Sequence, residues 1–269
     1  MGFLGIVVAV YGIFIALLYF GQRSLLYHPD QTVPQPANYG VGEMQPIRLP
    51  IGDGLELLAW WRPALTEEAP VIAYFHGNAG HIGNRADKVR AYLDAGYGVL
   101  LLSYRYNAGT GGSPSERALI LDAVKALEFL KSENIPDSRI VLYGESLGSG
   151  IAVQMAVTHD VGALVLEAPY SSMPDLAQHH YWYAPSRWLV RDRFDSVLRI
   201  SAVGTPLLIV HGDQDTVIPV KYARRLFDAA TEPKTFHLLT GARHNNLLDY
   251  GLPDVVLDFL KKRFPASAD

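Results

Sequence analysis

Short, continuously apolar runs that alternate with longer amphipathic segments constrain the fold of this chain more than any other feature. Seven runs are expected to form strands, at residues 55–61, 71–75, 98–104, 139–144, 163–168, 206–212 and 234–239. Segments with helical spacing lie between them, at residues 83–95, 114–133, 149–158 and 219–230. Continuous apolar runs are typical of parallel strands that helices cover on both faces. We therefore expect an α/β fold with a mostly parallel central sheet flanked by helices.

One serine lies between two glycines directly after a predicted strand. The sequence Gly144-Glu145-Ser146-Leu147-Gly148 follows the apolar residues VLY and precedes a segment with helical spacing. A sharp turn from a strand into a helix exposes such a serine hydroxyl, and small neighbours relieve the crowding of the turn. Ligands in parallel sheets bind at this carboxyl edge of the strands. Ser146 is therefore the candidate nucleophile.

A second loop of small residues, HGNAG at 76–80, follows the strand predicted at 71–75. Such a loop can offer backbone amides to a developing oxyanion, together with the amide of the residue after the nucleophile. The candidates for this oxyanion hole are Asn78, Ala79 and Leu147. His76 comes too early in the chain to be the base in this arrangement, and we expect it to make a structural hydrogen bond.

The last two predicted strands are each followed by a candidate partner for the serine. Asp215 lies in the HGDQD loop after residues 206–212, where a carboxylate can orient an imidazole. Asp213, in the same loop, is interpreted as a turn residue. His244 follows the last strand, and the chain order of serine, aspartate and histidine is the one expected for this turn. We expect His244 to act as general base, in chemistry that requires no metal or organic cofactor.

The N-terminal stretch at residues 2–20 contains nineteen residues and no charged side chain. This length fits a bilayer-spanning helix, which needs about 20 apolar residues. A cleaved signal peptide would show a basic start and a cleavage site, and a buried core helix would be apolar on one face only. We therefore expect a single-pass membrane anchor at 2–20, a connector at 21–43 and one catalytic domain at 44–269.

The residues that flank this stretch bear on its placement in a membrane. Tyr11, Tyr19 and Tyr27 are candidates for aromatic side chains at the bilayer interface. Arg23 is the only lysine or arginine near either end, and its position after the stretch favours a cytoplasmic catalytic domain. The net charge of −4 includes no block of basic residues, which gives a nucleic-acid role no support. The absence of cysteine excludes disulfides and thiolate catalysis.

The combined motifs resemble the α/β-hydrolase superfamily, and are most similar to its membrane-anchored Bem46-like branch. The matching segments are YFHGNAG (74–80), SYR (103–105), GGSPSE (111–116), YGESLGSGIA (143–152), HGDQDTVIP (211–219) and GARHNN (241–246). The resemblance covers residues 44–264. It implies a catalytic triad at Ser146, Asp215 and His244. Because members of this branch include thioesterases and lipid esterases, it also implies ester, thioester or lipid substrates with acyl chains.

About 35 residues between LEAPYSS (166–172) and TPLLIV (205–210) are predicted to form a small helical cap at about 170–205. Aromatic side chains on such a cap suit an apolar acyl group, and the candidates for substrate binding are Tyr181, Trp182 and Trp188. Two other interpretations remain open. These aromatic residues can pack the cap against the sheet, or they can contact lipid headgroups together with the arginines at positions 187, 191 and 193.

The sequence thus favours a membrane-anchored serine hydrolase that cleaves carboxylic esters or thioesters through an acyl-enzyme. Two alternatives share the fold. The first is a serine peptidase or amidase of the prolyl-oligopeptidase type. The second is a non-catalytic membrane interaction protein. Labelling of Ser146 by a fluorophosphonate, followed by turnover of esters, separates these hypotheses.

Overall fold

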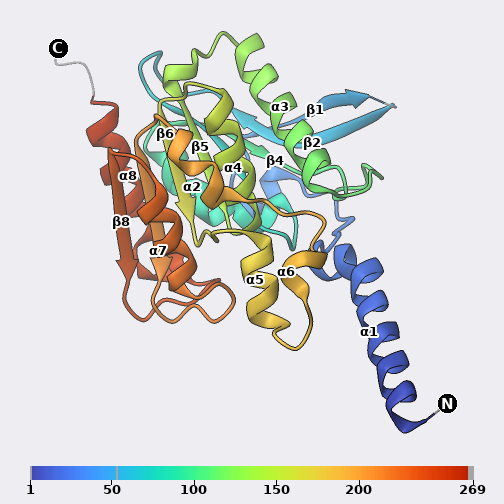
Figure 1. The fold of residues 1–269 in the computed structure, drawn as a ribbon. Coiled ribbons are helices and arrows are strands. Elements are labelled where there is room, and N and C mark those ends of the chain that lie inside the picture. The colour runs from blue at the N-terminus through green and yellow to red at the C-terminus, as the bar shows by residue number, and fades with distance from the viewer. Residues whose placement is uncertain (1, 53, 266–269) are drawn as a thin grey trace.

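The central element of the protein is an eight-stranded sheet, seen in a computed structural model that describes residues 2–52 and 54–265 (Figure 1). The strands are β1 (Gln45–Gly52), β2 (Leu55–Arg62), β3 (Val71–Phe75), β4 (Gly98–Leu102), β5 (Ile140–Glu145), β6 (Ala163–Glu167), β7 (Leu207–Gly212) and β8 (Lys234–Leu239). Their spatial order is β1-β2-β4-β3-β5-β6-β7-β8. The pairs β1–β2 and β2–β4 are antiparallel, and all other pairs are parallel. The expected α/β fold with a mostly parallel sheet is confirmed.

Strand β1 was not predicted from the sequence. Its residues QPIRLPIG include Pro46 and Pro50, which interrupt the apolar pattern and remove two backbone donors. The strand lies at the edge of the sheet and pairs only with β2 among the described residues, so proline is tolerated there.

Helices cover both faces of the sheet. They are α2 (Ala86–Asp94), α3 (Glu116–Ser132), α4 (Leu147–Thr158), α7 (Val220–Ala229) and α8 (Leu252–Arg263). Neighbouring residues of β3 point to opposite faces, as the pleat of a strand requires. Ala73 packs in one buried cluster with Leu119 of α3 and residues of α4 and α7, whereas Ile72 packs in a second cluster with Val89 of α2 and Val256 of α8. Both faces of the central strands are therefore buried.

Between β6 and β7 the chain leaves the sheet and forms the predicted cap segment. It contains α5 (Met173–His180) and the short α6 (Ser186–Leu189), followed by two single 3₁₀ turns. Ser172 caps α5 by accepting a hydrogen bond from the amide of Asp175. This segment lies beyond the carboxyl ends of the strands, beside the N-terminal helix (Figure 1).

The N-terminal helix α1 (Phe3–Leu26) projects away from the sheet (Figure 1). It continues six residues past the apolar stretch at 2–20, and so occupies the start of the predicted connector. Its mean hydropathy reaches 2.6 over eighteen residues, none of which is buried in the protein. Among the described residues, α1 is the one helix that is long and apolar enough to serve as a membrane anchor or as a signal sequence.

Candidate active site

Ser146 sits at the junction between β5 and α4 in a strained backbone conformation, with φ of 51° and ψ of −115°. The two glycines around it are required by close contacts. A Cβ atom at Gly148 would lie 2.0 Å from the carbonyl oxygen of Phe75, and one at Gly144 would lie 2.6 Å from the carbonyl oxygen of Gly148. The start of α4 therefore packs directly against the end of β3. A non-glycine residue with positive φ is held only by such surroundings, and strain of this kind concentrates at functional sites.

Ser146, His244 and Asp215 form a continuous chain of polar contacts. His244 Nε2 lies 3.0 Å from Ser146 Oγ, and His244 Nδ1 lies 2.7 Å from Asp215 Oδ2. The three residues come from the ends of β5, β8 and β7, so they share the carboxyl edge of the sheet. The structure thus brings together three residues that are separated by up to 98 positions in the sequence.

The Asp215 carboxylate is completely buried and has several donors around it. Its Oδ1 accepts hydrogen bonds of 2.8 Å from the amides of Val217 and Ile218, and His211 Nε2 lies 3.3 Å from its Oδ2. Burial alone would raise the pKa of this carboxyl, but the hydrogen bonds from His211 and His244 and the charge on His244 hold it below its ordinary value. A charged Asp215 can accept a hydrogen bond from Nδ1–H of His244, and in the neutral imidazole this tautomer leaves the lone pair of Nε2 facing Ser146.

Asp213 and His76, the two neighbouring alternatives, have other contacts. Asp213 Oδ1 accepts a 2.7 Å hydrogen bond from the amide of Gly241. His76 is buried, and its Nδ1 lies 2.7 Å from the carbonyl oxygen of Gly77. Burial, with the nearby charge of Arg85, lowers the pKa of His76 to about 3, so the ring is neutral. Within residues 2–52 and 54–265, neither side chain hydrogen-bonds to Ser146 or His244.

The candidate oxyanion loop is fixed through its carbonyl groups and one side chain. The carbonyl oxygen of Asn78 accepts from the amide of His28, and that of Ala79 accepts from Arg85 Nη1 at 2.9 Å. Asn78 Nδ2 donates to the carbonyl oxygen of Leu26, at the end of α1, at 2.8 Å. In the described part of the chain, no acceptor engages the amides of Asn78, Ala79 or Leu147. These amides are available to an incoming oxyanion.

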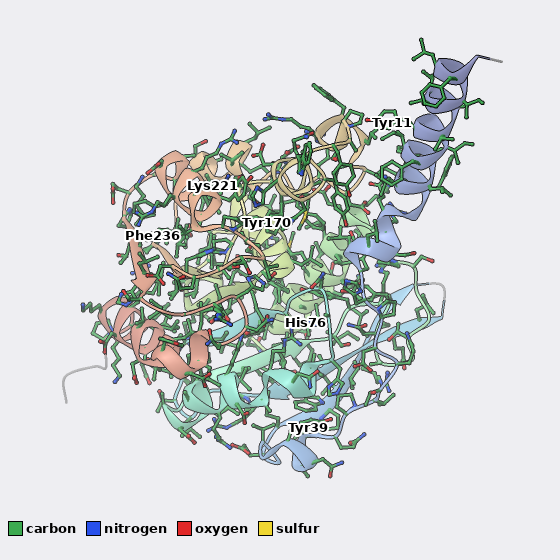
Figure 2. All side chains as sticks on the ribbon, turned by 90° about the horizontal axis from the view of Figure 1, so that it is seen from below. Tyr11, Tyr39, His76, Tyr170, Lys221 and Phe236 are labelled. Atoms are coloured by element: carbon green, nitrogen blue, oxygen red, sulfur yellow. The ribbon has the colours of Figure 1, made fainter. Side chains whose placement is uncertain are left out.

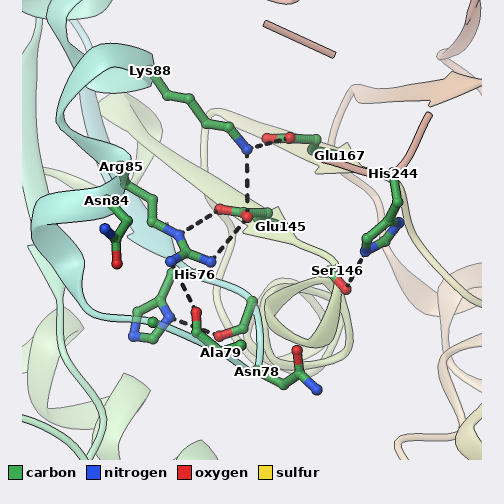
Figure 3. Close-up of polar contacts among 12 residues, drawn as sticks. His76, Asn78, Ala79, Asn84, Arg85, Lys88, Glu145, Ser146, Glu167 and His244 are labelled. Atoms are coloured by element: carbon green, nitrogen blue, oxygen red, sulfur yellow. Dashed lines mark hydrogen bonds and ion pairs between the residues drawn. The ribbon is translucent and has the colours of Figure 1, made fainter. Parts of the chain in front are cut away.

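A buried ionic cluster connects this loop to the turn at Ser146 (Figure 3). Arg85 Nη2 and Nε each lie 3.1 Å from an oxygen of Glu145, while Nη1 binds the carbonyl oxygen of Ala79. Lys88 Nζ lies 3.4 Å from Glu145 Oε1 and 2.5 Å from Glu167 Oε1. The same guanidinium group thus contacts both the oxyanion loop and the residue that precedes Ser146.

The cluster is held by charge and by phenol groups. Tyr74 donates a 2.8 Å hydrogen bond to Glu145, and Tyr143 donates one of the same length to Glu167. Burial alone would raise the pKa of Glu145, but the charges of Lys88 and Arg85 hold it well below its ordinary value. Glu145 therefore remains ionised inside the protein.

Neither His211 nor the ionic cluster was predicted from the sequence to lie at the site. His211 had one visible signal, because it lies near the end of a predicted strand, four residues before Asp215. The partners of Glu145 are Arg85 just before α2, Lys88 of α2 and Tyr74 of β3, and only the folded chain brings them to the turn.

A cavity of about 470 Å³ lies between α1 and the cap. Leu18 and Leu26 of α1 line one wall, and Leu176 and Leu189 of the cap line the other. Asn78 belongs to the lining, so the cavity reaches the candidate oxyanion loop. Of the three aromatic residues expected to bind substrate, Tyr181 lines the cavity. Trp182 and Trp188 lie outside the lining and are 76% and 79% exposed.

Comparisons with known proteins agree with this fold. A family model described as alpha/beta hydrolase fold matches residues 70–199. Protein Rv2307c of Mycobacterium tuberculosis is 34% identical over 94% of this chain and 91% of its own length. Protein bem46 of Schizosaccharomyces pombe is 29% identical over 94% of this chain and 90% of its own length. Lysophosphatidylserine lipase ABHD12 of Danio rerio is 30% identical over 77% of this chain and 62% of its own length.

Solved structures show the same architecture. The Pyrococcus furiosus esterase Pf2001 has a TM-score of 0.69, with 18% identity over 89% of this chain and 98% of its own. The alpha/beta hydrolase GrgF from Penicillium sp. sh18 has a TM-score of 0.68, with 18% identity over 83% of this chain and 99% of its own. With the family model and the sequence relatives, these matches establish that the chain belongs to the α/β-hydrolase superfamily.

Proposed function

We propose that this α/β-hydrolase is a membrane-anchored serine hydrolase that cleaves carboxylic esters or thioesters of acyl-chain substrates. The observation that carries the proposal is the unbroken line of contacts from the buried Asp215 carboxylate through His244 to Ser146 Oγ. A serine hydroxyl alone is a weak nucleophile, and this line supplies both a base and a group that orients the base.

In the proposed reaction, His244 Nε2 takes the Ser146 proton while Oγ attacks the carbonyl carbon of the substrate. The amide of Leu147 and an amide of the HGNAG loop stabilise the negative charge on the former carbonyl oxygen. Protonated His244 then gives its proton to the leaving alkoxide or thiolate, which leaves an ester between Ser146 and the acyl group. Water, deprotonated by His244, attacks this ester. The bond to Ser146 Oγ then breaks, His244 returns the proton to Oγ, and the carboxylic acid is released.

The cavity between α1 and the cap supports an acyl substrate. Its lining includes five leucine side chains, and a volume of about 470 Å³ suits part of an acyl chain or of a drug-sized molecule. The names of two similar proteins add support. One sequence relative is named lysophosphatidylserine lipase, and one protein of similar structure is named an esterase. We propose that Tyr181 contacts the substrate in this cavity.

The proposed location follows from α1. Its exposed, apolar surface suits lipid, with the stretch at 2–20 as the membrane-spanning part and Arg23 on the cytoplasmic side. The rest of the chain then comprises a connector that ends near residue 43 and a hydrolase domain at 44–269 with a cap at about 170–205.

A fluorophosphonate probe tests this function directly. We expect detergent-solubilised protein to be labelled and to hydrolyse p-nitrophenyl esters, and Ser146→Ala to lose both properties. Ser132→Ala is the matched control, because Ser132 is exposed at the end of α3 and its hydroxyl donates one hydrogen bond, to the carbonyl oxygen of Phe129. Equal labelling and turnover in Ser146→Ala would refute the proposal. Faster cleavage of amides than of esters would favour the peptidase or amidase alternative.

A further inference from the structure

The outer end of the cap lies against α1 along much of the length of that helix. We call residues 181–189 the cap tip. Tyr11 donates a 3.0 Å hydrogen bond to the carbonyl oxygen of Tyr183, and the rings of Phe14 and Tyr183 are 5.9 Å apart. Gln22, three turns further along the helix, donates to the carbonyl oxygen of Leu189 at 3.2 Å. Figure 2 shows Tyr11 where α1 passes the cap.

These contacts limit how α1 can enter a bilayer. Residues 3–10 extend beyond the cap tip, and at 1.5 Å per residue they measure about 12 Å. The hydrocarbon core of a bilayer is about 30 Å thick. If the cap tip stayed in water, less than half of the core could be crossed. A spanning α1 must therefore carry the cap tip into the membrane with it.

The chemistry of the cap tip suits this position. Residues 181–186 contain no charged side chain. Trp182 and Trp188 are more than three-quarters exposed, and Tyr183 is nearly half exposed. Tryptophan and tyrosine are preferred where one end of a side chain meets hydrocarbon and the other meets water.

Arginine side chains mark the edge of this apolar surface. Arg187 pairs with Asp175 at 3.2 Å, and the Arg191 guanidinium lies 5.9 Å from the ring centre of Tyr19. Long arginine side chains can keep their charge among headgroups while their stems lie against apolar groups. On α1, Arg23 donates two hydrogen bonds to the carboxylate of Asp192, which follows the cap tip in the chain.

We propose that the cap tip inserts into the same leaflet that α1 enters, so that the protein has two membrane contacts. This inference rests on the membrane location in the proposed function. The cavity then opens beside the acyl chains of that leaflet, because Leu18 and Leu25 of α1 and Leu176 of α5 line it. The substrate class that follows is a membrane-resident acyl lipid, which reaches Ser146 from the bilayer.

The tryptophan residues of this chain provide a direct test. The chain has four, of which Trp60 and Trp61 are buried while Trp182 and Trp188 are exposed. Full-length protein is reconstituted in phosphatidylcholine vesicles, with or without lipid brominated on its acyl chains. We expect brominated lipid to remove most of the emission of the two exposed residues, and aqueous iodide to remove little of it. The double variant W182F/W188F should lose this quenching.

A matched variant shows that the quenching is specific to the cap tip. Leu65→Trp is added to the W182F/W188F background. Leu65 is exposed and lies in the loop between β2 and β3, beside Gly96, at the end of the sheet opposite to the carboxyl ends of the parallel strands. The emission of the introduced tryptophan should be quenched by iodide and not by brominated lipid. Quenching of wild-type protein by iodide alone would overturn the proposal, and so would equal quenching of W182F/W188F by brominated lipid. Emission is measured without substrate, so the result is independent of whether Ser146 hydrolyses an ester.

Discussion

The side-chain amide of Asn78 donates a 2.8 Å hydrogen bond to the carbonyl oxygen of Leu26, the last residue of α1. The return contact, from the amide of His28 to the carbonyl oxygen of Asn78, is 3.2 Å long. The candidate oxyanion loop is therefore attached to the end of the candidate membrane helix. The position of α1 and the geometry of this loop are physically linked.

Asn78→Leu should lower kcat for p-nitrophenyl butyrate by roughly 10- to 100-fold, because a loop displaced by about 1 Å loses transition-state contacts. The backbone amide remains, so KM should change little. Steady-state kinetics measures both quantities. Asn78→Asp serves as a second variant of the same shape, and it should be equally impaired because a carboxylate cannot donate to Leu26. Full activity in either variant would contradict this assignment.

Asp215→Asn should reduce kcat by about 10³- to 10⁴-fold, because a neutral amide no longer fixes the required tautomer of His244 or its charged form. Asp213→Asn is the matched control in the same loop, and only its contact with the amide of Gly241 is weakened. Ester hydrolysis by the two purified variants gives the comparison. A greater loss in Asp213→Asn would mean that the triad has been assigned to the wrong aspartate.

His76 should make the protein less stable as the pH falls from about 6.5. Its pKa in the folded protein is about 3, so between these values the unfolded chain binds a proton that the native state does not. The free energy of unfolding should therefore fall by roughly 1 kcal/mol per pH unit in this range. Thermal unfolding in detergent at pH 7 and pH 5 reports the change.

His76→Asn provides the control for this pH dependence, because asparagine can donate to Gly77 but does not titrate. Its melting temperature should depend less on pH than that of the wild type. The comparison is made above pH 5, because the lowered pKa values of Asp215 and Glu145 cost stability only below about pH 4. Parallel pH profiles for the two proteins would show that His76 is not responsible.

Leu176→Trp should fill part of the cavity and shift the preference from long to short acyl esters, by roughly tenfold in the ratio of kcat/KM values. Leu198→Trp is the matched control, since Leu198 is 74% exposed and lies outside the cavity lining. The profile against p-nitrophenyl esters of increasing length is the measurement. An unchanged profile in Leu176→Trp would exclude this cavity as the acyl site.

Glu145→Gln should destabilise the protein by about 3 kcal/mol or more, because it leaves the buried charge of Arg85 without its carboxylate partner and leaves Lys88 with Glu167 alone. The release of Arg85 should also disturb the carbonyl oxygen of Ala79, and so lower kcat more than it raises KM. Glu128→Gln breaks an exposed pair with Lys125, which is worth at most about 1 kcal/mol. Thermal unfolding and kinetics of both variants decide whether Arg85 is a positioning residue. Equal effects in the two variants would argue against this role.

The sequence by itself determined the sheet and the location of the chemistry. Strand-forming runs such as residues 71–75 and 234–239 are confirmed with their predicted bounds. The first is a continuous apolar run that is buried throughout, whereas the second alternates between half-buried and exposed residues at the edge of the sheet. Once the strands are parallel, their carboxyl ends share one edge, so Ser146, Asp215 and His244 could be named from chain order. Strand β1 could not be predicted, because its prolines are tolerated only at the edge position that the completed sheet provides.

Only the tertiary structure decided how distant segments meet. The pairing of Arg85 with Glu145, the bond from Asn78 to Leu26 and the contact of Tyr11 with Tyr183 join segments 52 to 172 positions apart in the chain. Local periodicity carries no information on such pairs, since their partners are chosen by packing and by the need to neutralise buried charge. For the same reason Trp182 and Trp188, expected near the substrate, lie on the outside of the cap.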